Sequence, residues 1–136
     1  MNTINVSACD NELYIVAVLL KSSKESTDNL SNQLCHIQSG GNNKVAVKID
    51  IEVGNYEQYP TYNGVTKPLN IHSKVKLPKG DYNILAVAID WGGGRNIGVK
   101  INSGKLFGTD GYKSGPFDVG VYQVNEGKVL GKITVK

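Results

Sequence analysis

The stretch Ala88–Asn96, AIDWGGGRN, places the chain's only tryptophan and only arginine on either side of three consecutive glycines. A glycine turn leaves backbone groups exposed, and ligand-binding residues are concentrated on loops of this kind. Sugars are held by an aromatic face beneath their C–H groups and by polar groups around their hydroxyls. The pattern favours a binding loop in which Trp91 stacks on a ligand while Asp90, Arg95 and Asn96 form hydrogen bonds.

The same loop also has a structural interpretation. A single tryptophan at the end of a strand often fills the core or closes one end of a sandwich. In that case Trp91 is buried, and an acidic neighbour holds Arg95. The sequence leaves both interpretations open.

Two further loops carry aromatic side chains. GNYEQYPTYNG, between Gly54 and Gly64, contains three tyrosines at intervals of three: Tyr56, Tyr59 and Tyr62. Tyrosine combines an apolar ring with a polar tip, so this loop predicts an amphipathic contact surface. The alternative is that the loop folds down over one open end of the fold. Tyr112 is the candidate in the third loop.

Phosphate binding and nucleophilic catalysis lack their motifs. The glycines Gly92, Gly93, Gly94 and Gly98 miss the GxGxxG spacing, and the following segment NIGVKI is typical of a strand, not a helix. Cys35 and His36 are neighbours, so an extended segment points them to opposite faces. No GxSxG motif occurs. We therefore expect a protein that is not an enzyme.

Metal-ligand spacing is also missing. Cys9, Cys35, His36 and His72 form neither a zinc pattern nor a CxxC pair, and the cysteines are expected to be reduced and buried. Gly108–Gly115 offers only one carboxylate for calcium, and an ordinary polar turn is the favoured interpretation. We expect no metal and no cofactor.

One segment resembles a known family. GTDGYKSGPFDVGV is similar to the end of the soluble, calcium-dependent, galactose-binding bacterial lectins over about a tenth of the chain, at these positions: Thr109, Ser114, Gly115, Phe117 and Val119. The family's two asparagine ligands fall on Tyr112 and Lys113, and its upstream aspartate falls on Lys105. Since lysine does not coordinate calcium, the metal site is not carried over, and no family membership follows.

The elements that must position these loops are strands. In KVAVKIDIEV, Lys44–Val53, apolar residues alternate with polar ones, which is typical of a half-buried strand. LNIHSKVKL repeats the alternation and places His72 on its polar face, whereas YNILAVAID is apolar on both faces and predicts a central strand. Shorter candidates are TINVSA, LYIVAVLLK, NIGVKI, PFDVGVYQV and KVLGKITVK. The expected fold is all-β, a single antiparallel β-sandwich of about eight strands with jelly-roll or Greek-key topology, spanning residues 1–136.

The connections add local predictions. Asn-x-Gly-Lys occurs twice between apolar runs, predicting hairpin loops in which Gly104 and Gly127 adopt positive φ. The PKG of KLPKGDYN predicts a third hairpin. Within Ser22–Asn43 the spacing of Leu30 and Leu34 allows a short helix.

Composition limits the partners. The 136 residues carry a formal charge of +3, and all but one of the 15 basic residues are lysines. Base and phosphate recognition usually recruits arginine, so nucleic acid is not an expected partner. The apolar run Tyr14–Leu20 is shorter than the roughly 20 residues of a membrane span and lacks the basic residues of a signal peptide. A soluble chain is expected.

These observations together predict a lectin-like module that binds a glycan or another cell-surface ligand. The alternatives are a membrane-acting β-sandwich toxin component in contact with a membrane surface, and a self-assembling structural protein. A homo-oligomer would suit a weak sugar site, because linked sites raise avidity.

Overall fold

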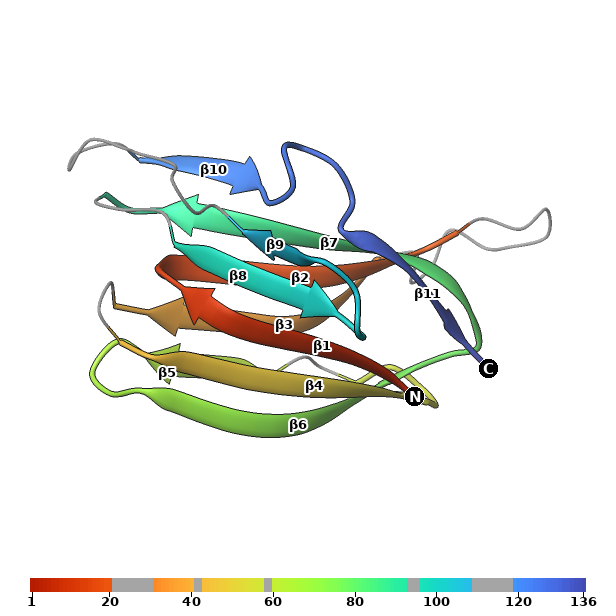
Figure 1. The fold of residues 1–136 in the computed structure, drawn as a ribbon. Helices are drawn as coiled ribbons and strands as arrows, with labels where there is room; N and C mark the ends of the chain where they lie inside the picture. Colours follow the sequence, from red (N-terminus) through yellow and green to blue (C-terminus); the bar gives the residue numbers. More distant parts are fainter. Residues whose placement is uncertain (21–30, 41–42, 58–59, 93–95, 109–118) are drawn as a thin grey trace.

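The computed structural model describes residues 1–20, 31–40, 43–57, 60–92, 96–108 and 119–136. It places them in two β-sheets packed face to face (Figure 1). The strands are β1 (Asn2–Cys9), β2 (Asn11–Leu19), β3 (Ser31–Ser39), β4 (Val45–Val53), β5 (Thr61–Gly64), β6 (Leu69–Leu77), β7 (Gly80–Asp90), β8 (Ile97–Ile101), β9 (Leu106–Gly108), β10 (Gly120–Gln123) and β11 (Gly131–Val135). The expected all-β sandwich is confirmed, with eleven strands in place of about eight. Among the described residues no helix is long and apolar enough to cross a membrane.

Each sheet has a defined strand order. The five-stranded sheet runs β6-β4-β1-β8-β9, and the six-stranded sheet runs β10-β7-β2-β3-β5, with β11 also paired to β7. Strand β7 is central, as its apolar faces predicted, since β2 lies on one side of it and β10 and β11 on the other.

The sheets are mixed, and the expected purely antiparallel arrangement is wrong. Strand β3 pairs with β5 in parallel, and β4 pairs with β6 in parallel. The reason is that the chain alternates between the two sheets from β3 to β6, so each strand returns to its sheet in the direction of the strand two places earlier. Leu34, assigned to a short helix by its spacing, lies in β3, while residues 21–30 fall outside the described part.

The core follows from the alternation along each strand. In β4 the side chains of Val45, Val47, Ile49 and Ile51 are buried, and the residues between them face outward except where Asp50 is covered. In β7 the buried set begins with Tyr82, which is 1 % exposed. A strand in a two-layer fold buries one face, so period two selects the core residues.

Some of the turn predictions are confirmed and others are wrong. The hairpin joining β8 and β9 is confirmed, but its left-handed residue is Asn102 (φ 53°) and not Gly104. Asparagine tolerates this conformation, so the glycine is not needed there. The PKG segment is not a hairpin, because it carries the chain from β6 in one sheet to β7 in the other.

The second Asn-x-Gly segment lies between β10 and β11, which do not pair with each other. Both run antiparallel to β7, one along Val87–Asp90 and the other along Gly80–Ile84. Three successive residues between them have positive φ: Asn125, Glu126 and Gly127. The positive φ predicted for Gly127 is confirmed. The segment is not a hairpin, because β10 and β11 follow one another along the same side of β7 and the segment loops out between them.

Candidate functional site

Trp91 lies on the surface at the end of β7, and its side chain is 63 % exposed. Its indole Nε1–H donates a hydrogen bond of 2.9 Å to Oε1 of Glu12, which is itself only 6 % exposed. The structural interpretation, with Trp91 in the core, is therefore wrong. One edge of the indole is anchored to a buried carboxylate while much of the ring remains accessible.

Glu12 is the centre of a group of polar side chains on the outer face of the six-stranded sheet. Its Oε2 accepts hydrogen bonds from the Tyr14 hydroxyl (3.2 Å), from Nε2 of Gln38 (3.3 Å) and from Nε2 of His36. Burial alone raises the pKa of Glu12. The hydrogen bonds from Trp91, His36, Gln38 and Tyr14 outweigh that effect and hold the pKa below its usual value.

The register of three neighbouring strands produces this group. In the β2–β3 pair, Glu12 lies opposite Gln38 and Tyr14 lies opposite His36. On the other side of β2, Glu12 lies opposite Ile89, near the end of β7. The rings of Tyr14 and His36 stack with centroids 4.1 Å apart and planes 3° apart. Residues directly opposite across antiparallel strands are close enough for such contacts.

Sequence reasoning missed Glu12, Tyr14, His36 and Gln38 as members of a group. The available signal was the alternation in NELYIVAV, which places Glu12 and Tyr14 on the face opposite Leu13 and Ile15. Nothing local indicated that β3 would bring a histidine and a glutamine beside them, because that pairing depends on the fold.

The structure describes two of the other predicted residues of the glycine loop, Asp90 and Asn96. Asp90 is 1 % exposed, and its Oδ1 accepts hydrogen bonds from the Gly92 amide (2.9 Å) and from Nδ2 of Asn11 (3.2 Å). Arg95 lies outside the described residues. Asn96 is exposed at the start of β8, in the five-stranded sheet, whereas Trp91 lies over the six-stranded one. The loop therefore joins β7 in the six-stranded sheet to β8 in the five-stranded one.

In the part of the tyrosine loop that the structure describes, the tyrosine side chains fold down onto the protein. Tyr56 and Tyr62 are partly buried and pack against the core, and the Tyr56 hydroxyl donates to the Gln33 carbonyl over 2.7 Å. Tyr59 and Tyr112 lie outside the described residues, as does most of the lectin-like segment and of the loop Gly108–Gly115.

The cysteines and histidines do not form a catalytic pair. Cys9 and Cys35 are free and buried, as expected, and burial raises the pKa of each thiol to about 12. His36 points to the outer face, away from Cys35, as the strand alternation predicted. Among the described residues no group of three histidine, cysteine, aspartate or glutamate side chains could hold a metal ion.

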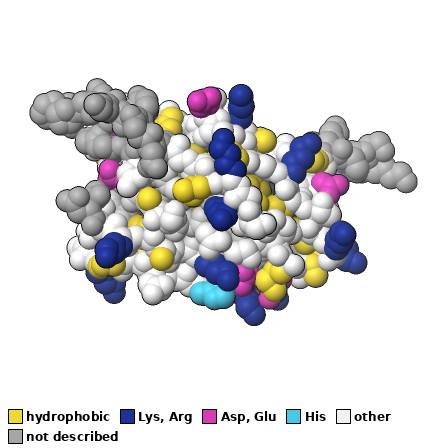
Figure 2. All heavy atoms as spheres, in the orientation of Figure 1, with side chains coloured by type: hydrophobic (Ala, Val, Ile, Leu, Met, Phe, Trp, Pro, Cys, Tyr) yellow, Lys and Arg dark blue, Asp and Glu magenta, His cyan; other side chains and the backbone are white. Residues whose placement is uncertain are grey.

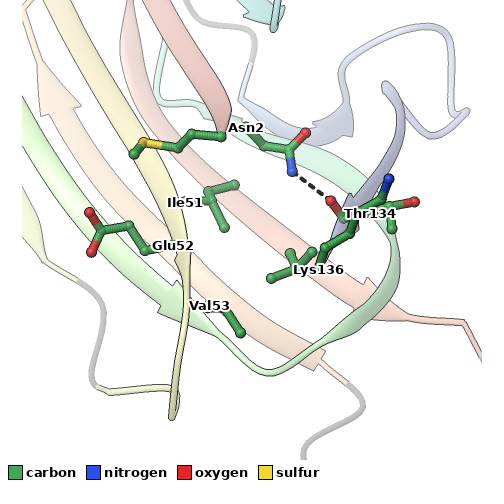
Figure 3. A pocket seen from close by; sticks show the side chains of 8 residues that line it. Asn2, Ile51, Glu52, Val53, Thr134 and Lys136 are labelled. Atoms are coloured by element: carbon green, nitrogen blue, oxygen red, sulfur yellow. Dashed lines mark hydrogen bonds between the residues drawn. The ribbon is translucent and has the colours of Figure 1, made fainter.

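A hollow of about 470 Å³ lies where the two ends of the chain meet (Figure 3). Its lining includes Asn2, Ile51, Glu52, Thr134 and Lys136. Nδ2 of Asn2 donates to the Thr134 carbonyl over 2.8 Å and joins the first strand to the last. This hydrogen bond links the two sheets at that edge of the sandwich.

Comparisons with protein-family models, with curated proteins and with solved structures find no match. The geometry around Trp91 therefore carries the functional proposal.

Proposed function

We propose that this protein is a non-enzymatic, lectin-like carbohydrate-binding module that uses the exposed face of Trp91 as its sugar platform. The observation that carries the proposal is the combination of 63 % exposure of Trp91 with an indole N–H already bonded to buried Glu12. An aromatic face held in one orientation loses little conformational freedom on binding. Such a platform suits the C–H face of a sugar ring.

A sugar site also needs polar groups for the sugar hydroxyls, and polar side chains lie beside the platform. Gln38 lies next to Glu12 across the β2–β3 pair, and Asn63 lies next to Gln38 across the β3–β5 pair. Thr61 lies beside His36 in the neighbouring row. These amide and hydroxyl groups carry no charge, so we propose a neutral sugar as the ligand, held by hydrogen bonds to its hydroxyls.

The chemistry of Glu12 supports binding and not catalysis. Both of its carboxylate oxygens already accept hydrogen bonds from side chains of this chain. A general acid or base must reach a proton on the substrate, and a carboxylate fully occupied by internal donors is better suited to positioning.

A glycan array tests the proposal with the labelled wild-type protein, Trp91→Ala and Trp91→Phe. We expect selective binding by the wild type, loss of that binding in Trp91→Ala, and partial retention in Trp91→Phe, which keeps an aromatic face. Both variants lose the hydrogen bond to buried Glu12, so we expect both to remain folded and to unfold at similarly lowered temperatures, and the comparison between them isolates the aromatic face. Array binding unchanged in Trp91→Ala, or a wild type that binds no glycan, would overturn the proposal.

A second candidate function, self-association, is favoured by the outer face of the six-stranded sheet. We define its apolar face as Tyr14, Val16, Val18, Leu85, Val87, Ile89 and Val121. Cross-strand pairs such as Val16–Leu85 and Ile89–Val121 make these side chains contiguous, and Val121 is 69 % exposed. No lysine or arginine occurs in β2, β3 or β7, and Lys132 of β11 lies at the margin of the apolar face beside Asn83, so two copies can meet here with little like-charge repulsion. A two-fold axis perpendicular to the strands would place apolar side chains on apolar side chains.

Analytical ultracentrifugation tests this second candidate. We expect a dimer for the wild type, a monomer for Val87→Lys in the apolar face, and a dimer for the control Val53→Lys. Val53 is a comparably apolar residue, 47 % exposed, at the end of β4 in the other sheet. A wild type that stays monomeric at high concentration would exclude self-association through this face.

A further inference from the structure

The outer face of the five-stranded sheet carries a row of four polar side chains, two of them lysines, that crosses four strands. Lys100 of β8 lies opposite Asn5 of β1, Asn5 lies opposite Lys48 of β4, and Lys48 lies opposite His72 of β6. We call these four residues the lysine row. Figure 2 shows this face, with basic side chains in dark blue across it and a histidine in cyan at its lower margin.

The pairing defines the spacing of the two lysines. Neighbouring strands lie about 4.8 Å apart, so the backbones of Lys100 and Lys48 are about 10 Å apart with the Asn5 amide between them. Neither ammonium group has an acidic partner within 4.0 Å among the described residues. Both charges are therefore available to an anion.

The acidic residues of the same face are already paired. Asp50 accepts hydrogen bonds from Nε2 of His72 (2.6 Å) and from the Thr3 hydroxyl (2.9 Å). Glu52 lies 3.4 Å from Nζ of Lys74. On this face the lysines Lys48, Lys74, Lys76 and Lys100 outnumber the carboxylates Asp50 and Glu52, so the face carries an excess of positive charge, with Asp50 lying beside Lys48 on the same strand.

The distribution of lysines argues against solubility as their sole purpose. Strands β4, β6 and β8 contain Lys48, Lys74, Lys76 and Lys100, whereas β2, β3 and β7 of the other sheet contain no lysine or arginine. Lysines placed only for solvation would be expected in similar numbers on both outer faces. The strands of the six-stranded sheet carry one lysine, Lys132 of β11, so the outer face of the five-stranded sheet is the more basic of the two.

We propose that the lysine row is a binding site for a linear acidic polysaccharide, sulfated or carboxylated, lying across the strands with its anions on Lys48 and Lys100. A row one residue wide suits an extended chain. A bilayer surface would favour apolar side chains beside the lysines, whereas the neighbouring row on these strands holds Thr3, Asp50 and Lys74. Lysine contacts sulfate and carboxylate groups as a point charge without demanding bidentate geometry. This site lies on the opposite sheet from Trp91 and does not rest on the function proposed above.

Surface plasmon resonance on immobilised dextran sulfate, with uncharged dextran as reference, tests the site. We expect the wild type to bind dextran sulfate, and the double variant Lys48→Gln/Lys100→Gln to bind about tenfold more weakly. The matched control is Lys128→Gln/Lys132→Gln, which removes the same charge from exposed positions outside this face. This control is expected to bind nearly as tightly as the wild type. The dependence of binding on salt concentration is expected to be weaker in Lys48→Gln/Lys100→Gln and unchanged in the control.

The outcomes separate this site from the others. Trp91→Ala is expected to keep its affinity for dextran sulfate, whatever the glycan array shows. Equal weakening in both double variants would reduce the effect to net charge and overturn the proposal, as would a wild type that does not bind. Binding to vesicles of phosphatidylserine and phosphatidylcholine without binding to dextran sulfate would also overturn it, in favour of a membrane surface.

Discussion

The indole N–H of Trp91 and the carboxylate of Glu12 are joined by a hydrogen bond of 2.9 Å across 79 positions of sequence. Glu12 brings Tyr14, His36 and Gln38 to the same place. The exposed tryptophan is thus supported by a buried carboxylate with four donors. We expect its orientation to depend on that carboxylate remaining charged.

Glu12→Gln tests this dependence. The substitution keeps the shape but removes the charge and points an amide at side chains that already donate. We expect the free energy of unfolding to fall by about 2 kcal/mol, and quenching of Trp91 fluorescence by iodide to increase as the indole is released. The control Glu57→Gln changes an exposed glutamate and is expected to alter neither quantity. Unchanged quenching in Glu12→Gln would show that the hydrogen bond does not hold the indole.

The pH dependence of stability follows from the lowered pKa of Glu12. Its folded pKa lies below the unfolded value of about 4.3, so the unfolded state takes up the proton first as the pH falls. The stabilisation is present above the unfolded pKa and is lost as the pH falls through the folded pKa. Urea titrations between about pH 7 and about pH 3 should show a steeper loss for the wild type than for Glu12→Gln. Parallel curves for the two proteins would contradict this assignment.

The two thiols are expected to be unreactive in the folded protein. Burial is the largest cause of a pKa near 12 for Cys9 and for Cys35, and only the thiolate attacks disulfide reagents. With a chromogenic disulfide reagent at about pH 8, we expect no release of product from native protein. Unfolding in urea should then expose both cysteines of the chain. Rapid labelling without denaturant would show that one of the thiols is accessible.

Asn11 has two roles at the turn between β1 and β2. Its φ of 81° is left-handed, and its Nδ2 donates to buried Asp90. Asn11→Ala loses both the tolerance of this conformation and the donor, so we expect destabilisation by about 2–3 kcal/mol in urea unfolding. Asn11→Gly restores the backbone freedom and should recover part of the loss. Equal destabilisation by the two variants would assign the whole effect to the hydrogen bond.

The strands with regular alternation were predictable from sequence. In β4 the pattern from Val45 to Val53 identifies both the strand and its buried face, because the side-chain period of a strand is a local property. The polar strand β3 was not predictable in this way. Ser31–Ser39 mixes amides, a cysteine and a histidine, and it acquires its structure by pairing with β2 and β5.

The candidate site was predictable only in part. Trp91 was identified from its place beside the glycines, and the structure shows it exposed. Asp90 was expected to contact a ligand but is buried and used by Asn11 and Gly92. Polar type and loop position do not reveal whether a side chain supports the backbone or faces solvent, since that depends on the strands packed around it.

The sequence by itself determined the strand content, the buried faces of the regular strands and the two reduced thiols, because each follows from residue type and local period. Only the tertiary structure decided which sheet each strand joined and in which register. That choice brought Glu12 beneath Trp91 and aligned Lys48 with Lys100 across Asn5. Both arrangements depend on pairing between distant segments, where the free energy comes from burying the two sheets against each other and not from any local preference.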